Sequence, residues 1–515
     1  MPEHTVQFVG RRTLRLHPID NVVIAARPLA AALHLEEERV TTVDPVPAGH
    51  KLATAAVGEG EPVRRYGQIV GFATRPIAPG EHVHLHNLAA GDAAAQYEFG
   101  TDLKTVPLPK QPATFLGIRR ADGRVATRNY LGVLSTVNCS ATVAKMIADR
   151  FRRFRGHDPL ARWPNVDAVV ALTHPGGCGS SPFGEGYGVF QRTLAGYARH
   201  PNFAGILVVG LGCEVNQIQF LMNAQRLQEG TMLATMNIQD IGGTQAIVDW
   251  GERRLLEMLP VADAVRREPV GADHLIVGLQ CGGSDGFSGV TANPALGAAV
   301  DLLVAHGGTG VLSESPELFG AQHLLTRRAV SREVADKVVA CIDWWQAYFA
   351  RHVGKVVNTA PGNFEGGLTT SPEKSLGSFA KGGTTNLTGF FGYAEPITAK
   401  GFVYMDTPSY DPVSVTGQIA GGANLICFTT GRGSAFGSVP APCLKLATNT
   451  PLYRKQLDDM DINCGDILDG TAGIGETGQR IFERMLAVAS GEKTKSERFG
   501  YGELEFSPWL IEPTL

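Results

Sequence analysis

The chain has 515 residues, of which 43% are hydrophobic and 19% charged, and its 46 basic and 50 acidic side chains give a net charge of −4. Such values predict a globular protein with a sizeable core, divided into roughly two to four domains. Nucleic-acid binding is disfavoured because no block of lysine or arginine is present. A membrane span is disfavoured because the longest apolar runs fall well short of ~20 residues.

The eight cysteines follow no disulfide framework, so we expect reduced thiols or metal ligands. The amino-terminal sequence lacks the basic, apolar and small-residue succession of a signal peptide. We therefore expect a cytoplasmic protein with a small-molecule partner and no nucleic-acid or membrane partner. The composition leaves open whether the chain forms a homo-oligomer.

Short alternating apolar runs separated by glycine and proline turns predict a small all-β module over residues 1–90. Residues 91–113 are rich in small residues and proline and have no period, so they are expected to form a linker. Strand-like runs then alternate with helix-like segments, which is typical of an α/β fold with mostly parallel sheets. We place the first α/β domain at 114–268 and the second at 269–515.

Four cysteines follow strand-like runs at the point where each run breaks into glycine. An α/β sheet gathers ligand groups at the carboxyl ends of its strands, so this pattern predicts that the four thiols converge on one site. Thiolates favour iron, either as a single Fe(II) ion or as an iron–sulfur cluster, although other divalent metals also fit. The four strand-end cysteines are Cys139, Cys178, Cys213 and Cys281. The alternative is that each of these four is an ordinary free thiol, which is the interpretation we favour for the other cysteines Cys341, Cys427 and Cys443.

Two glycine-rich turns follow further strands, in CGGSDGFSGVTANPALG and FTTGRGSAFGS. Their backbone N–H groups suit a carboxylate or phosphate, and Arg432 offers a bidentate carboxylate partner. Neither turn matches a nucleotide-binding motif. Tight turns between packed elements are an equally good interpretation of each alone, but the pair favours binding of a small, anionic, polyhydroxylated molecule.

Histidines are concentrated in the β module. The period of two places His82, His84 and His86 on one face of a strand, with His17 expected nearby. Such a face is either a metal or substrate edge or a solvated surface, and we favour the functional reading. His50, judged alone, is a structural turn residue. Glu314 and Glu317 are equally well explained as ordinary acids at a helix amino terminus.

Long, ordered strings carry a family resemblance along almost the whole chain. The strings are GRVATRNYLGVLSTVNC, GLGCEVNQ, LQCGGSDGFSGVTANPALG, SESPELFGAQHLLTRRA, APGNFEGGLTTSPEKSLG, FTTGRGSAFG and MDINCG, with LHPIDNVVIA, AGHKLA, RRYGQIVGFA and GEHVHLHN in the module. On these strings the chain resembles the altronate and galactarate dehydratase family, and its β module resembles the amino-terminal SAF domain, a β-clip, of that family. The resemblance implies a lyase that removes water from a hexonate or hexarate to give a 2-keto-3-deoxy acid, with a divalent metal, typically iron.

Dehydration of this kind needs a group that takes the C2 proton and stabilisation of the resulting enediolate. We expect metal ligands or acid/base groups among His17, His84 and His86, with the four strand-end cysteines as a second set of iron ligands. The remaining catalytic candidates are His50, Lys51 and Arg128, the last two near the substrate carboxylate. The expected substrate-binding residues are Asn21, Ser284, Asp285, Thr291, Asn293, Thr430 and Arg432.

The substrate is left open by the sequence. GEHVHLHN and SESPELFGA resemble altronate enzymes, whereas MDINCG resembles the galactarate type. A lyase acting on another 2-hydroxy acid such as sulfolactate is one alternative. It is disfavoured because the β module and the α/β body are separate chains in the sulfolactate enzyme, whereas they are fused in this chain. A non-catalytic sugar-acid binding protein is the other, and the clustered cysteines and histidines argue against it.

Overall fold

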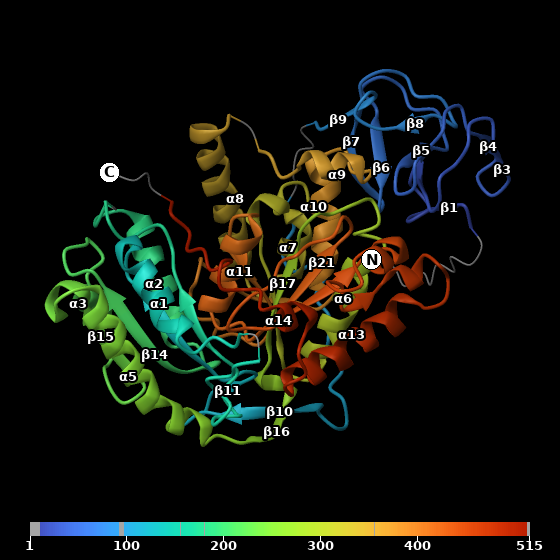
Figure 1. Ribbon diagram of the computed structural model, residues 1–515. Coiled ribbons are helices and arrows are strands. Elements are labelled where there is room, and N and C mark those ends of the chain that lie inside the picture. The colour runs from blue at the N-terminus through green and yellow to red at the C-terminus, as the bar shows by residue number, and fades with distance from the viewer. Residues whose placement is uncertain (1–10, 92–96, 155, 180, 355, 512–515) are drawn as a thin grey trace.

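The computed structural model describes residues 11–91, 97–154, 156–179, 181–354 and 356–511. A strand-rich amino-terminal module is followed by a body of parallel sheets and helices, as predicted from the sequence (Figure 1). Residues 92–96 of the predicted linker lie outside the described ranges. Residues 97–113 contain no helix or strand and run along the body, where the Gly100 N–H donates to the Thr326 carbonyl at 3.1 Å.

The amino-terminal module is built from short antiparallel strands around its own small apolar core, which includes Val23, Leu35 and Leu52. One sheet has the order β1-β2-β5-β8 and another the order β6-β7-β9, while β3 and β4 form a separate pair. The strands are β1 (Thr13–Leu14), β2 (Val22–Ala25), β3 (His34–Leu35), β4 (Val40–Thr41), β5 (Lys51–Ala53), β6 (Pro62–Arg65), β7 (Gln68–Ala73), β8 (His82–Val83) and β9 (Leu88–Ala89).

The first unit of the body is a four-stranded parallel sheet of order β13-β12-β14-β15 with helices packed on it. Its strands are almost wholly apolar, as expected for a parallel sheet covered on both faces. The elements are β12 (Tyr130–Ser135), β13 (Val169–Leu172), β14 (Phe203–Gly210), β15 (Leu233–Asn237), α1 (Ala141–Asp149), α2 (Glu185–Ala198), α3 (Ile218–Ala224), α4 (Ile238–Ile241) and α5 (Thr244–Asp263).

The second unit is a seven-stranded parallel sheet of order β19-β20-β18-β17-β21-β22-β23. Its strands are β17 (Ile276–Cys281), β18 (Thr309–Leu312), β19 (Leu387–Phe391), β20 (Gly401–Met405), β21 (Leu425–Thr430), β22 (Cys443–Ala447) and β23 (Ile462–Asn463). Its helices are α6 (Ala292–Ala305), α7 (Gln322–Arg328), α8 (Arg332–His352), α9 (Pro361–Glu365), α10 (Ser371–Phe379), α11 (Asp411–Ala420), α12 (Thr450–Lys455), α13 (Ile474–Ala489) and α14 (Lys495–Phe499).

The chain order in this sheet reverses at β17. It builds outward from β17 through β18 on one side and then returns to the other side with β21, so β17 and β21 flank a topological switch point. Ligands of open α/β sheets bind in the crevice at the carboxyl ends of such strands. Both glycine-rich turns predicted from the sequence follow these two strands.

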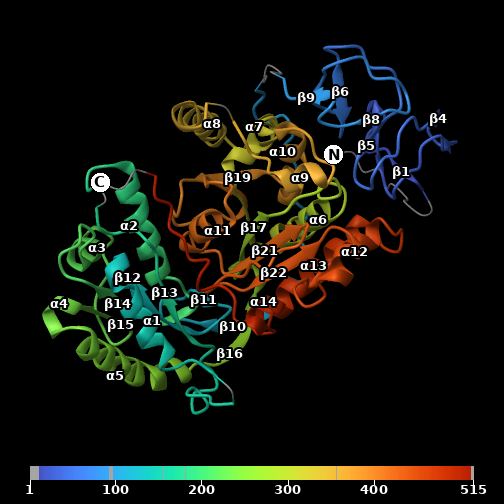
Figure 2. The same cartoon turned by 45° about the horizontal axis from the view of Figure 1, so that its top comes forward.

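A three-stranded antiparallel sheet joins the two units of the body, with order β11-β10-β16. It consists of β10 (Thr114–Arg119), β11 (Val125–Ala126) and β16 (Arg267–Gly271), so the predicted boundary between residues 268 and 269 falls inside a strand. The amino-terminal module lies beside α9 and α10, on the opposite side of the molecule from the four-stranded sheet, in both views (Figures 1 and 2). Among the described residues, no helix is both long and apolar enough to cross a membrane.

Candidate active site

Two glycine-rich loops lie at the switch point, where open α/β sheets bind ligands, and we call the surface that these loops form the crevice floor. The Gly431 and Arg432 N–H groups donate to the Gly283 carbonyl at 3.1 and 2.9 Å, which joins the loop after β21 to the loop after β17. Gly283 has a φ of +61°, a backbone conformation that residues other than glycine rarely adopt. The crevice floor is therefore a pair of mutually bonded turns.

Asp285 holds these turns together from beneath. It is buried, and burial raises the pKa of its carboxyl. One oxygen accepts from the Phe287 N–H and the Ser288 hydroxyl, and the other accepts from the Thr448 hydroxyl at 3.0 Å. A Cβ on Gly431 would lie only 2.1 Å from this carboxyl, so the loop after β21 rests directly on it. The predicted substrate ligand thus shapes the crevice floor.

Several other predicted substrate ligands use their polar atoms to hold the backbone. Thr291 donates to the Thr448 carbonyl, and Asn293 bonds Gly377 and Thr429. In the module, Asn21 bonds the backbone of Pro62 and Arg64. The polar atoms of these three residues already hold the backbone, and their contact with a substrate stays a prediction. The Thr430 hydroxyl likewise accepts from the Gly433 N–H, and the Ser284 carbonyl accepts from the Asn363 amide.

Arg432 is the predicted cation that stands at the crevice mouth. Its side chain is 47% exposed, and its guanidinium donates to the Glu365 carboxylate at 2.8 Å. Exposed pairs of this kind contribute ~0–1 kcal/mol, so a competing carboxylate can displace Glu365 at little cost. Glu365 was not anticipated from the sequence, which gives no sign that the end of α9 reaches the loop after β21.

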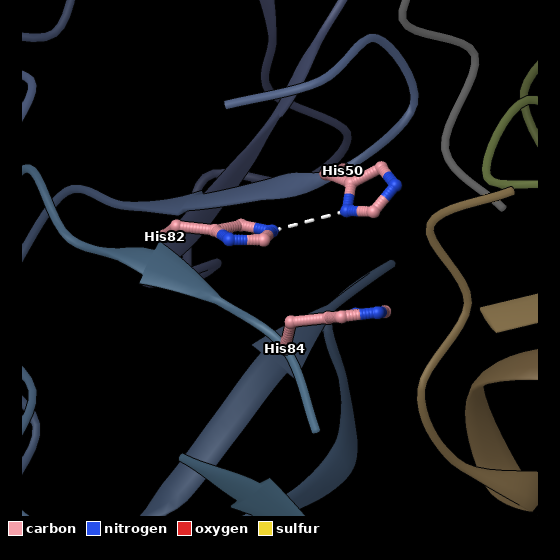
Figure 3. Close-up of side chains that lie close together, drawn as sticks. All are labelled: His50, His82 and His84. Carbon is pink, nitrogen blue, oxygen red and sulfur yellow. Dashed lines mark hydrogen bonds between the residues drawn. The ribbon is translucent and has the colours of Figure 1, made fainter. Parts of the chain in front are cut away.

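The module presents a histidine cluster beside the end of α9. The Nδ1 of His50 lies 3.0 Å from the Nε2 of His82 (Figure 3). The Nε2 of His50 lies 3.2 Å from the Glu365 carbonyl oxygen. Each of His50, His82 and His84 offers one ring nitrogen within 4.8 Å of the others. The Nδ1 of His84 is buried with no hydrogen-bond partner, an arrangement that a bound cation would satisfy.

His82, His84 and His86 do not alternate along one strand, as the sequence predicted, because only His82 lies in β8. Strand β8 ends at Val83, and the chain then turns so that the Leu88 N–H donates to the His84 carbonyl at 2.9 Å. The rings still gather, since the centroids of His82 and the exposed His86 are 5.5 Å apart. His17 instead accepts from the Ile19 N–H and packs over the turn at Gly67, outside the three-residue group.

The electrostatics keep this cluster uncharged. Burial, together with the neighbouring histidines and Lys51, lowers the pKa of His82 to about 3 and that of His84 to about 4. Burial also lowers the pKa of His50. Near neutral pH the three rings are therefore neutral imidazoles, the form that binds metals.

Lys51 serves to dock the module on the body. Its ammonium is fully buried and donates to the Gly367 carbonyl and to both Glu373 oxygens, each at 2.9 Å. Arg65 reaches the same carboxylate at 2.6 Å. Burial alone would raise the pKa of Glu373, but these two cations lower it to about 2. The prediction that Lys51 lies near a substrate carboxylate is corrected, because its partner is the carboxylate of Glu373.

Arg128 also differs from its predicted role. Its side chain is buried just before β12, at the amino end of that strand rather than the carboxyl end. The guanidinium donates to both Glu497 oxygens and to the carbonyls of Thr127, Val488 and Glu492. All five of its N–H groups are thus used to join the two units of the body.

The four strand-end cysteines do not share one site. Cys281 ends β17 in the seven-stranded sheet, where its buried thiol lies 3.6 Å from a Glu314 oxygen and 3.4 Å from a Glu317 oxygen. Cys139, Cys178 and Cys213 follow strands of the four-stranded sheet instead, and their thiols are exposed. The expectation of a single four-thiol centre fails because the strands belong to two different sheets.

Comparisons with known proteins agree with the three parts of the fold. Residues 11–91 match the altronate/galactarate dehydratase SAF domain. Residues 117–263 match the second domain of D-galactarate dehydratase/altronate hydrolase, and residues 272–514 match the C-terminal domain of D-galactarate/altronate dehydratase.

Relatives of known activity align along most of the chain. The chain is 34% identical to an altronate dehydratase of Bacillus subtilis over 495 residues, covering 95% of this chain and 97% of the relative. It is 36% identical to a galactarate dehydratase of Escherichia coli over 506 residues, covering 95% and 94%. A (2R)-sulfolactate sulfo-lyase subunit beta of Chromohalobacter salexigens is 32% identical over 396 residues, covering 76% and 96%. The chain therefore belongs to the altronate/galactarate dehydratase family of hydro-lyases.

Proposed function

We propose that the protein removes water from a hexonate or hexarate sugar acid to give a 2-keto-3-deoxy acid, with a divalent metal, iron in the first instance, at the histidine cluster. One observation carries the proposal. Three neutral imidazoles of the module gather beside the end of α9, whose Glu365 contacts both His50 and Arg432 at the crevice. The site thus combines metal ligands with a carboxylate-binding cation.

The chemistry of the donor set supports the choice of metal. His50, His82 and His84 would hold the ion, and the unpartnered Nδ1 of His84 is the clearest vacant ligand atom. Imidazole nitrogens suit iron, zinc and copper, whereas calcium and magnesium prefer oxygen ligands. When bound, such an ion supplies Lewis acidity that stabilises negative charge on the substrate carboxylate and its neighbouring hydroxyl.

The side chains of the crevice would perform the remaining tasks. Arg432 exchanges Glu365 for the substrate carboxylate and so fixes the orientation of the acid. His86 is exposed beside His82, and its ring is available to take the proton from C2 of the substrate or to return it to the departing hydroxyl. The bonded loops at Gly283 and Gly431 hold the crevice floor rigid during the reaction.

A substrate panel tests this function. The anaerobic protein is supplied with Fe(II) and assayed against altronate, galactarate and sulfolactate, and formation of 2-keto-3-deoxy acid is measured. Product from altronate or galactarate supports the proposal. Release of sulfite from sulfolactate alone, or tight binding of sugar acids without product from any of them, would contradict it.

The variant His34→Ala serves as the matched control for the histidine site. His34 lies in the same module but is exposed on β3, where its Nδ1 contacts the Thr41 hydroxyl at 3.1 Å. We expect this variant to keep wild-type turnover. An equal loss of turnover in His34→Ala and in the cluster variant His84→Ala would show that the substitutions damage the module as a whole and do not act through the histidine cluster.

A further inference from the structure

Three exposed cysteines occupy one edge of the four-stranded sheet. Cys139, Cys178 and Cys213 lie in the turns directly after β12, β13 and β14, which are neighbours in the order β13-β12-β14. Because parallel strands end at the same edge, the three turns lie side by side. These thiols differ from the other five cysteines, all of which are buried.

Two buried polar residues join the three turns. The Asn216 N–H donates to the Gly177 carbonyl at 3.1 Å, and its amide donates to the Thr136 carbonyl at 3.1 Å. One Glu214 oxygen accepts from the Thr136 hydroxyl at 2.7 Å and from the Leu211 N–H at 3.1 Å. Both side chains come from the turn of Cys213, so that turn is fixed to the turns of Cys139 and Cys178.

Glycine permits the closest approach between these turns. Gly177 has a φ of +99°, and a Cβ there would lie 2.3 Å from the Thr136 carbonyl oxygen. The turn of Cys178 therefore rests directly on the turn of Cys139, and the Asn138 N–H donates to the Gly176 carbonyl at 3.0 Å. The three turns at this edge are therefore fixed to one another, and each of them carries an exposed cysteine.

The spacing of the thiols limits what they could bind. A single ion with ~2.3 Å bonds to sulfur brings its thiolates within about 4 Å of one another. Among the described residues, the groups whose ligand atoms lie within 4.8 Å of one another do not include these three cysteines. An iron–sulfur cluster spreads its ligands more widely because each cysteine binds a different iron.

We propose that Cys139, Cys178 and Cys213 bind a [4Fe–4S] cluster through three thiolates, which leaves the fourth iron open to water or another oxygen ligand. Each thiol releases one proton to solvent and forms one iron–sulfur bond. Cys281 is not the fourth ligand, because it is buried in the other sheet beside Glu314. This centre is separate from the histidine cluster and does not rest on the proposed reaction.

Anaerobic reconstitution of the full chain with equal amounts of Fe(II) and Fe(III) and with sulfide tests the proposal, because the oxidised cluster contains two irons of each kind. We expect broad visible absorption, iron and acid-labile sulfide near four of each per chain, and an electron paramagnetic resonance signal on reduction. Each of Cys139→Ser, Cys178→Ser and Cys213→Ser should lower the bound sulfide at least ~10-fold. Cys341→Ala and Cys281→Ala, which change buried thiols elsewhere, should keep the wild-type cluster content.

Thiol labelling provides a second readout that does not depend on the variants folding. Before reconstitution the three exposed thiols should react rapidly with iodoacetamide, and after it they should be protected. The proposal is overturned if the wild-type chain takes up no sulfide, or if Cys213→Ser keeps the full cluster. The histidine site is tested independently, since His84→Ala should lose turnover yet retain the cluster.

Discussion

The described residues contain two sets of three side chains that could hold a metal ion, with ligand atoms within 4.8 Å of one another, and the two sets have opposite surroundings. One set is His50, His82 and His84 on the amino-terminal module, and the other is Cys281, Glu314 and Glu317 at the end of β17. The histidine set is partly exposed, whereas the second set is fully buried. Distance alone does not distinguish them.

Charge does distinguish them. The second set already contains its cations, because Lys381 contacts Glu314 and Lys374 contacts Glu317, each at 2.7 Å. Burial and Glu317 raise the pKa of Glu314 to about 8, and burial and Glu314 raise that of the Cys281 thiol to about 12. Both carboxylates of this set are thus already paired with ammonium groups, which a metal would have to displace. The histidine set is neutral and has an unpartnered nitrogen, so we infer that it is the set that binds metal.

The largest effect is expected at the histidine set. His84→Ala removes a ligand, so metal content should fall and kcat/KM should drop by at least ~100-fold, since a Lewis-acid metal contributes several kcal/mol to the transition state. Metal analysis and steady-state assays measure the two effects. If His84→Ala keeps both metal and turnover, the distinction between the two sets is wrong.

Removal of a lysine from the buried set should affect stability. Lys381→Met leaves the buried Glu314 carboxyl without its hydrogen-bond partner, so the free energy of unfolding should fall by about 1–3 kcal/mol. Lys337→Met, which removes an exposed pair with Glu333, should cost less than about 1 kcal/mol. Denaturant titrations with and without added Fe(II) compare the two variants. If added Fe(II) restores the free energy of unfolding that Lys381→Met loses, the buried set is a metal site.

The docking of the module should depend on pH. The pKa of Glu373 is lowered from an ordinary value of 4.5 to about 2, so its carboxylate stabilises the fold above about pH 4.5, and this contribution is lost as pH falls toward 2. Glu373→Gln should therefore destabilise the chain by ~3 kcal/mol at pH 7 and by progressively less between pH 4.5 and pH 3. Unfolding curves at several pH values measure the difference. A gap between wild type and variant that does not narrow on acidification would contradict this account.

The smallest effect is expected at the crevice mouth. Arg432→Ala should raise KM for the sugar acid by ~10-fold, because one charge-assisted contact to a carboxylate is lost. Stability should change little, since the pair with Glu365 is exposed. Arg332→Ala, which removes another exposed pair, should leave KM unchanged. A reduced kcat with constant KM would mean that Arg432 acts on the transition state only.

Local patterns were sufficient for much of the fold and for part of the site. The apolar runs ending at Cys139 and Cys281 predicted parallel strands, and the glycine-rich turns predicted the loops of the crevice. The spacing of His82, His84 and His86 indicated a histidine group, although β8 is too short to create it by alternation. Each of these features depends on residues close together in the chain.

The docking network could not be inferred in the same way. Lys51 and Glu373 are 322 positions apart, and nothing near either residue indicates the other. Arg128 likewise reads as an active-site cation until its contacts with Glu497 are known.

The sequence by itself determined the fold class, a strand-rich module followed by an α/β body, and the kinds of ligand available, because these follow from periodicity, turn residues and side-chain chemistry. Tertiary structure alone decided which ligands meet. It separated Cys281 from the other strand-end cysteines by placing β17 in a different sheet, and it brought His50 to His82 and to the end of α9. The reason is physical: long-range contacts are selected by packing and charge balance across the whole fold, which no local pattern encodes.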